Sequence, residues 1–223
     1  MAGREEQEAA RLLGRGLELL GLALAEKQVA QLVSFCLELA KWNRKVNLLA
    51  KDTPLHDIVD KHLLDSLTLV PLLNRLLPAG GTLLDVGSGA GFPGLPVKIA
   101  CPAWKITLLE PRERRCIFLR HIIRTMALPG ICVEPTRIEE GRLQAAYQVI
   151  TGRAVAEVPS FLAMVAGLAT PETCVICMQG EGGRQELQPG DRVDAFVCAG
   201  VEEARLPLSG DQRYLLLFRR KGE

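Results

Sequence analysis

A glycine-rich stretch with an acidic residue at its start is the most informative part of this sequence. It reads DVGSGAGFPG over residues 85–94, directly after a short apolar run, and Glu110 ends the next apolar run, 19 residues after Gly91. Glycines let the backbone turn tightly and approach a ligand closely. In open α/β sheets, ligands bind beside the carboxyl ends of the strands. The stretch therefore indicates a ligand-binding loop.

Three interpretations of this loop are open. Residues 89–94 formally match the dinucleotide motif G-x-G-x-x-G, but Asp85 would repel a pyrophosphate. The same carboxylate suits a ligand with a cationic end, such as the ammonium of a methionine moiety, and Glu110 can accept hydrogen bonds from two ribose hydroxyls. The order of acid, glycine loop and second acid favours S-adenosylmethionine over a dinucleotide or a purely structural turn. The cofactor residues predicted on this basis are Asp85, Gly87, Gly89, Gly91 and Glu110.

Basic residues are concentrated locally although the whole chain is nearly neutral. The 223 residues hold 27 Lys and Arg against 26 Asp and Glu, so nucleic-acid contacts would have to come from clusters. Each cluster is either a solvated helix face or a phosphate-binding surface. One comprises Lys98, Lys105, Arg112, Arg114, Arg115, Arg120 and Arg124, and the smaller one comprises Lys41, Arg44, Lys45 and Lys51.

Polar side chains interrupt the apolar stripes of two predicted N-terminal helices. Asn43 and Asn47 fall on the stripe that contains Cys36, and His62 and Ser66 are four residues apart with Asp65 beside Ser66. Buried polar groups need partners. We expect these residues to form a structural network between the N-terminal helices and the rest of the chain, with direct contact to RNA or cofactor as the alternative. Trp42 is predicted to be a half-buried anchor, whereas His56 and His121 receive no role.

Seven cysteines, an odd number, suggest free thiols in a chain without an export signal. Cys174 and Cys177 form a C-x-x-C pair inside a predicted buried strand, where an offset of three places the two side chains on opposite faces. No second pair supplies metal ligands. We therefore expect core cysteines and no metal.

The pattern of predicted elements changes near residue 79. Helices are predicted over about 4–22, 26–47 and 54–73, the last with Thr53 as N-cap and Pro54 at the first helical position. Strands are then predicted over 83–86, 105–110, 131–134, 147–150, 173–178, 192–201 and 214–219, with helices over 112–127 and 158–168. Alternating strands and helices indicate a parallel α/β sheet. We expect an N-terminal helical cap, residues 1–78, on a Rossmann-like domain of three layers, residues 79–223.

Together these motifs resemble the RsmG (GidB) family of bacterial 16S ribosomal RNA methyltransferases. The resemblance covers most of the chain and rests on W42-N-x3-N47-L, H62-x2-D65-S-L, the loop 85–96, R115-x2-F-L, R137-I-E-E and R153-A. It implies a class I S-adenosylmethionine-dependent fold and methylation of guanosine N7 in 16S RNA. Cofactor contacts are implied for Gly87, Phe92, Glu110, Ile138, Glu139 and Arg153, and RNA contacts for Arg114, Arg115, Arg120 and Arg153.

The chain departs from the family pattern at three places. Glu110 replaces the usual Asp, and Arg114 precedes Arg115 where Lys-Arg is usual; both changes keep the charge. Gln179 precedes Gly180 where Lys-Gly is common, which removes a cation that would hold RNA phosphate. Arg184 is a candidate substitute for that lysine.

Guanine N7 carries a lone pair and no proton, so we assign no general base and expect positioning to supply most of the rate. Arg153 is expected to lie partly solvated at the pocket mouth, so that Arg153→Ala lowers activity at least about tenfold but changes the stability within about 1 kcal/mol. The expected partner is the small ribosomal subunit, without membrane contact, and the expected state is a cytoplasmic monomer. The alternatives are a methyltransferase for another RNA or a small molecule, and a non-catalytic cofactor-binding or RNA-binding module.

Overall fold

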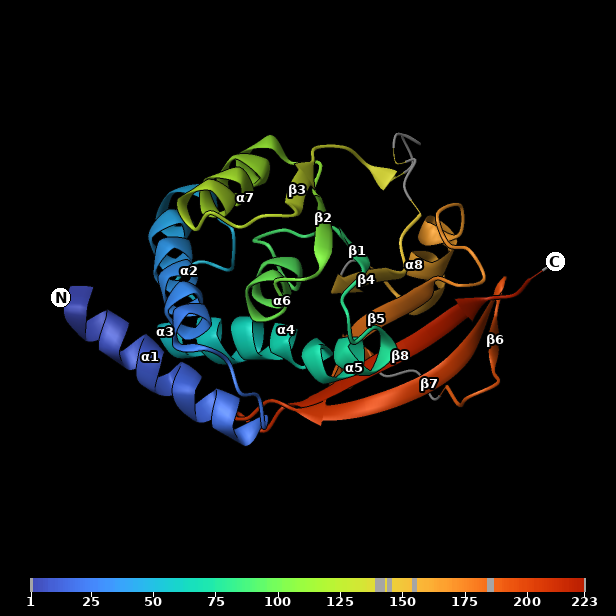
Figure 1. Ribbon diagram of the computed structural model, residues 1–223, viewed down its shortest axis with the longest axis horizontal. Helices are drawn as coiled ribbons and strands as arrows, with labels where there is room; N and C mark the ends of the chain where they lie inside the picture. The colour runs from blue at the N-terminus through green and yellow to red at the C-terminus, as the bar shows by residue number, and fades with distance from the viewer. Residues whose placement is uncertain (1, 139–142, 144–145, 154–155, 184–186, 223) are drawn as a thin grey trace.

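A mixed sheet of eight strands forms the centre of the computed structural model, which describes residues 2–138, 143, 146–153, 156–183 and 187–222 (Figure 1). The strand order is β3-β2-β1-β4-β5-β8-β7-β6. The first five strands in this order are parallel and are β1 Thr82–Val86, β2 Lys105–Leu109, β3 Ile131–Glu134, β4 Val149–Arg153 and β5 Cys174–Gly180. Their runs are mostly apolar because helices cover both faces of a parallel sheet.

The remaining strands extend the sheet in the antiparallel sense. They are β6 Arg192–Val193, β7 Phe196–Arg205 and β8 Gln212–Arg220, and β8 pairs with β5 so that Gly180 lies opposite Arg213. The predicted strand over 192–201 is therefore split after Val193. The predicted strand over 147–150 is shifted, because β4 runs on to Arg153 and ends at the same edge of the sheet as β1 and β2.

Helices α6 Gly94–Ala100, α7 Glu113–Thr125 and α8 Val158–Val165 connect the parallel strands. A short 3₁₀ helix, Glu181–Gly183, follows β5. The N-terminal helices are α1 Ala2–Leu19, α2 Glu26–Val46, α3 Leu55–Ile58, a π-helix over Val59–Leu64, α4 Asp65–Leu67 and α5 Leu69–Leu76. Helix α2 lies beside α6 and α7 at one end of the molecule (Figure 1).

The predicted cap of the third helical segment is wrong. Pro54, not Thr53, is the N-cap, with φ −70° and ψ 156°, and the helix begins at Leu55. The Thr53 hydroxyl instead donates to the Ala50 carbonyl at 2.7 Å, within the preceding turn. The sequence pattern also gave no sign of the π-helical segment, and such segments are frequent at functional sites.

Two hydrophobic clusters lie on the two faces of the sheet. The larger joins the N-terminal helices to α6, α7 and one face of the sheet, and the smaller packs α8 against the other face. Cys174 belongs to the first cluster and Cys177 to the second, which confirms their placement on opposite faces, and both thiols are free. The division of the chain after residue 78 stays a prediction, although the larger cluster runs across it. Within the described residues, no helix is long and apolar enough to cross a membrane.

Candidate cofactor and substrate site

The glycine loop lies at the carboxyl end of β1 and is tightly packed against its surroundings. Gly91 has a φ of +94°, and a Cβ there would lie 2.3 Å from Leu95 Cδ1. A Cβ on Gly94, the first residue of α6, would lie 2.3 Å from Leu108 Cδ2. The positive φ favours glycine at position 91, and a side chain at either position would force the neighbouring leucine side chain to move. The loop over 85–94 is therefore packed closely against α6 and β2.

The Asp85 carboxyl group lies under the loop without full hydrogen bonding. Its Oδ2 accepts a bond of 3.0 Å from the Gly94 N–H, whereas Oδ1 is buried and has no partner among the described residues. Burial raises the pKa of Asp85 to about 7, against the opposing effect of the Gly94 bond. A buried carboxylate oxygen without a donor is costly. A cationic ligand group that donates to Oδ1 would remove that cost, which fits the ammonium of S-adenosylmethionine.

Glu110 holds the same loop from the end of β2. Its Oε2 accepts from the Gly89 N–H and its Oε1 from the Arg112 N–H, both at 2.9 Å, and Arg115 Nη1 lies 3.5 Å from Oε2. Each carboxylate oxygen can accept more than one hydrogen bond. Glu110 therefore orders the loop and keeps acceptor capacity for ribose hydroxyls. The structure thus brings both predicted acids to one loop, where Glu110 binds Gly89 and Asp85 binds Gly94.

Phe92 connects this loop to the N-terminal helices. Its ring centroid lies 5.4 Å from that of Phe35 and 5.2 Å from that of His62, and the Arg153 guanidinium carbon lies 5.0 Å from it. Phe92 is thus buried between the loop, the helices and the end of β4. The Phe92 ring thus joins the glycine loop to His62, which belongs to a polar motif of the N-terminal helices.

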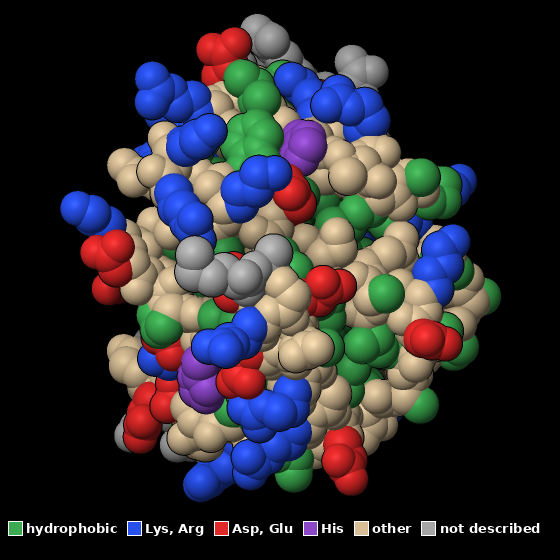
Figure 2. Space-filling view, turned by 90° about the vertical axis from the view of Figure 1, so that its left-hand side faces the viewer, with side chains coloured by type: hydrophobic (Ala, Val, Ile, Leu, Met, Phe, Trp, Pro, Cys, Tyr) green, Lys and Arg blue, Asp and Glu red, His purple; other side chains and the backbone are tan. Residues whose placement is uncertain are grey.

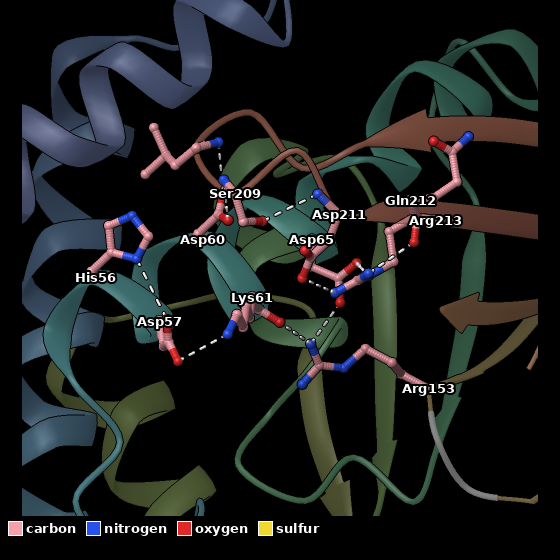
Figure 3. A network of polar contacts seen from close by, with 11 residues as sticks. His56, Asp57, Asp60, Lys61, Asp65, Arg153, Ser209, Asp211, Gln212 and Arg213 are labelled. Atoms are coloured by element: carbon pink, nitrogen blue, oxygen red, sulfur yellow. Dashed lines mark hydrogen bonds and ion pairs between the residues drawn. The ribbon is translucent and has the colours of Figure 1, made fainter. Parts of the chain in front are cut away.

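Arg153 is tied to the N-terminal helices, which corrects the expectation of a partly solvated arginine without a charge partner. Its Nη1 donates to the Lys61 carbonyl and to Asp65 Oδ2, both at 2.9 Å, and its Nη2 lies 2.8 Å from His62 Nδ1. Figure 3 shows the side chain of Arg153 pointing toward Asp65. The side chain is only 17% exposed. Its predicted part in the cofactor site stays a prediction.

Arg213 is a site residue that the sequence interpretation missed. Its Nε donates to Asp65 Oδ1 at 3.0 Å, so that one buried carboxylate binds two guanidinium groups (Figure 3). A cavity of about 330 Å³ lies beside this cluster, lined by His62, Asp65, Arg153, Met178, Gln179, Gly180 and Arg213. The antiparallel pairing of β8 with β5 brings Arg213 there. The available signal for Arg213 was its position directly before the predicted strand over 214–219.

Arg213 lies beside the position where the sequence departs from the family pattern. It is on the strand next to Gln179 and Gly180, and its guanidinium group is paired with Asp65. Arg184 lies outside the described residues, and so does Glu139. Ile138 is half-buried against the smaller hydrophobic cluster, and its adenine contact stays a prediction.

The asparagines of the first N-terminal motif shape a loop rather than join the core. Asn43 donates to the Ala50 carbonyl at 3.2 Å and accepts from the Leu49 N–H at 2.7 Å. Asn47 is exposed and ends α2 with a φ of +46°, so its predicted place on the buried stripe is wrong. Trp42 is half-buried as predicted and packs 5.5 Å from Phe118 and 5.1 Å from His121. His121, which had no predicted role, pairs with Glu38 at 3.0 Å.

The basic cluster over 98–124 divides in the structure. Lys98 is buried, and its Nζ donates to the carbonyls of Pro102 and Trp104 at 2.7 and 2.6 Å, so it is not on a basic surface. Lys105 is exposed at the start of β2, the end of the strand away from the glycine loop. The exposed arginines, which we name the α7 arginines, are Arg112, Arg114, Arg120 and Arg124. Lys and Arg side chains gather on the face that carries α2 and α7 (Figure 2).

Solved structures with a similar fold include a methyltransferase domain and a protein in complex with S-adenosylmethionine. The METTL16 methyltransferase domain aligns with a TM-score of 0.59 at 15% identity, covering 90% of this chain and 83% of that one. A mutant of MtNAS in complex with S-adenosylmethionine aligns with a TM-score of 0.58 at 16% identity, covering 88% and 80%. These likenesses confirm the predicted fold, a class I S-adenosylmethionine-dependent methyltransferase sheet with flanking helices.

Sequence comparisons are more specific. The ribosomal RNA small subunit methyltransferase G of Desulfotalea psychrophila is 42% identical over 213 residues, 93% of this chain and 96% of that protein. The protein of the same name from Geobacter metallireducens is 39% identical over 223 residues, 98% of this chain and 99% of that protein. The family described as rRNA small subunit methyltransferase G (GidB) matches residues 28–215. This chain, with its acid-flanked glycine loop and its paired arginines, belongs to the rRNA small subunit methyltransferase G family.

Proposed function

We propose that this protein transfers a methyl group from S-adenosylmethionine to N7 of a guanosine in the 16S RNA of the small ribosomal subunit. The observation that carries the proposal is the juxtaposition of two acids with an arginine-lined cavity. Asp85 and Glu110 lie at the glycine loop, and Phe92 of the same loop contacts Arg153, which lines the cavity. One half suits a cationic cofactor and the other a polyanionic substrate, and family membership favours ribosomal RNA as that substrate.

The chain's own residues have a limited chemical task in this reaction. When bound, S-adenosylmethionine supplies a methyl group on a positively charged sulfur, which is an activated electrophile. Guanine N7 has an in-plane lone pair and no proton, so no side chain has to remove one. Asp85 and Glu110 would hold the cofactor, and Phe92 would line the approach to its sulfonium group. Holding the two reactants in line then supplies most of the rate.

Two rounds of measurement test the proposal. Calorimetry with S-adenosylhomocysteine should find one site, and Gly87→Val should abolish it, because Gly87 has a φ of +68° that valine avoids. Labelled cofactor should then transfer methyl groups to unmethylated small-subunit RNA or particles, and nucleoside analysis should identify 7-methylguanosine. Cofactor binding without transfer would favour a binding module, and transfer only to small molecules would exclude RNA as the substrate. Because the substrate is ribosomal, we place the reaction in the cytoplasm and expect a monomer to carry it out.

A further inference from the structure

The cavity beside Arg153 has the size and the lining of a binding site for one nucleotide. Its volume of about 330 Å³ lies within the range of roughly 300–1,000 Å³ that small-molecule sites occupy. It opens at the carboxyl ends of β4 and β5, where ligands bind in α/β sheets. Its lining contains two guanidinium groups and one carboxylate, which favours an anionic occupant such as a nucleotide over a neutral one.

His62 in this cavity has a fixed protonation pattern. Arg153 Nη2 lies 2.8 Å from His62 Nδ1, and a guanidinium group can only donate hydrogen bonds. Nδ1 is therefore the acceptor, the imidazole is neutral, and Nε2 carries the hydrogen. Burial, followed by the charge of Arg153, lowers the pKa of His62 to about 3, so the ring stays neutral near pH 7. Stacking on Phe92, at 5.2 Å and 27°, restrains the ring plane.

The Nε2–H of His62 is a donor without a partner among the described residues, because the hydrogen bond found for this ring is the one at Nδ1. Arg153 prevents the exchange of the two nitrogens, since an Nδ1–H would face a second donor. His62, which lines the cavity, thus has a ring N–H that cannot become an acceptor. Such a group discriminates between ligands that present an acceptor and ligands that present a donor.

We propose that His62 selects guanine as the methylated base by donating from Nε2–H to O6 in this cavity, an inference that rests on the proposed function. The Hoogsteen edge of guanine presents two acceptors, O6 and N7, whereas adenine presents an amino group in place of O6. A bond to O6 leaves the N7 lone pair free to react. Adenine would place its amino group against the Nε2–H, and neither group could accept. His62 is therefore a specificity-determining residue and not an acid or base.

A matched pair of variants separates the two nitrogens of His62. In His62→Asn, the side-chain oxygen replaces Nδ1 as the acceptor for Arg153, but nothing replaces Nε2. In His62→Gln, the amide NH₂ reaches the position of Nε2 as a donor. We expect kcat/KM for methyl transfer to fall about tenfold or more in His62→Asn and to recover partly in His62→Gln. Affinity for S-adenosylhomocysteine should remain unchanged in both variants.

Changing the base tests the same contact from the other side. 2-Aminopurine keeps N7 and the 2-amino group of guanine but lacks O6. With small-subunit RNA carrying it at the methylated position, the parent should lose about tenfold or more in rate relative to guanine. His62→Asn should show little preference between the two bases, because the two deletions remove one interaction and are not additive.

The outcomes distinguish this inference from the proposed function. A parent protein that methylates no guanosine of small-subunit RNA contradicts the proposed function. A parent that methylates guanine and 2-aminopurine equally, or a His62→Asn variant that retains the full preference for guanine, overturns the role of His62 alone. If His62→Asn fails to fold, His62→Gln provides the test. This variant should still prefer guanine over 2-aminopurine, and a loss of that preference would contradict donation to O6.

Discussion

Two groups of arginines on one molecule have opposite environments. Arg153 and Arg213 have side chains that are 17% exposed and share the buried carboxylate of Asp65. The α7 arginines are exposed, and within the described part of the chain no carboxylate pairs with any of them. The first pair connects the N-terminal helices to β4 and β8, whereas the second group faces solvent. The arginines near this cavity therefore divide into those that line it and those that face solvent.

A second buried carboxylate, that of Asp60, also connects the N-terminal helices to the antiparallel strands. The Asp60 carboxylate accepts from the backbone N–H groups of Leu208 and Ser209 at 3.1 and 2.9 Å, in the turn between β7 and β8 (Figure 3). Asp60 and Asp65 thus hold the start of β8, and the turn before it, against the π-helical segment and the helix that follows that segment. Pairing of β8 with β5 brings Arg213 to the cavity, and Asp65 binds its guanidinium group there. The cavity is therefore a joint product of the N-terminal helices and the antiparallel part of the sheet.

The largest effect is expected from removing the shared carboxylate. Asp65→Asn leaves two guanidinium groups facing one neutral amide, and breaking a buried ion pair in this way costs about 3–5 kcal/mol. Denaturant unfolding of the variant should show that loss. As a control, Asp57→Asn breaks the more exposed Lys61–Asp57 pair of 3.1 Å and should cost less than about 1 kcal/mol. Equal small losses in both variants would contradict a buried ion pairing of Asp65 with Arg153 and Arg213.

Removing one of the paired arginines should have an intermediate effect. Arg153→Ala deletes bonds to Asp65, to the Lys61 carbonyl and to His62, while Arg213 remains to neutralise Asp65. We expect a loss of about 1.5–3 kcal/mol in the free energy of unfolding, the range for hydrogen bonds to charged groups. The control is Arg114→Ala, which should leave the stability unchanged. A loss below about 1 kcal/mol in Arg153→Ala would return it to the solvated position expected from the sequence.

The sequence allows prediction of those parts of the candidate site whose residues follow consecutive strands. The loop over 85–94 and Glu110 follow consecutive strands, so the alternating pattern alone places them at one edge of the sheet. The partners of Arg153 could not be found in this way, because Asp65 is 88 positions away and no local pattern indicates which charges meet. Lys98 shows the same limit: its type suggests a surface, but the carbonyls that bind it belong to the turn after α6.

The fold was predictable for a related reason. Apolar strands separated by helices have few compatible topologies, and the prediction erred mainly at the ends of elements, as at Thr53 and at both ends of β4. Arg213 was missed because the sequence does not state that β8 inserts between β5 and β7. Tertiary pairing of distant strands, not local propensity, placed that cation in the cavity.

Asp85 offers a pH-dependent contrast to the paired acids. Its folded pKa, raised to about 7 by burial, lies above the unfolded value, so the ligand-free protein gains stability at low pH and loses it as pH rises through 7. The slope should reach up to about 1.4 kcal/mol per pH unit. Affinity for S-adenosylhomocysteine should rise over the same interval, because the ionised carboxylate attracts the ammonium group. Unfolding and calorimetry between pH 5 and 8 measure both.

Two variants make that contrast specific. Asp85→Asn should flatten both pH dependences, since the amide does not titrate. Glu110→Gln should weaken the binding of S-adenosylhomocysteine but keep the pH dependence that Asp85 causes. An unchanged slope in Asp85→Asn would assign the titration to another group.

The smallest expected effect belongs to the α7 arginines. Removing one arginine that binds a phosphate should lower the slope of log affinity against log salt by about one unit, without a change in base preference. Arg114→Gln and Arg120→Gln should each do so for small-subunit RNA, while Arg115→Gln should instead weaken cofactor binding, because Arg115 lies 3.5 Å from Glu110. Lys105→Gln is the matched control, since Lys105 is equally exposed but lies at the opposite end of β2. Equal slopes in Arg114→Gln, Arg120→Gln and the parent would make the α7 surface a solvated helix face, and RNA attraction would then depend on the cavity arginines.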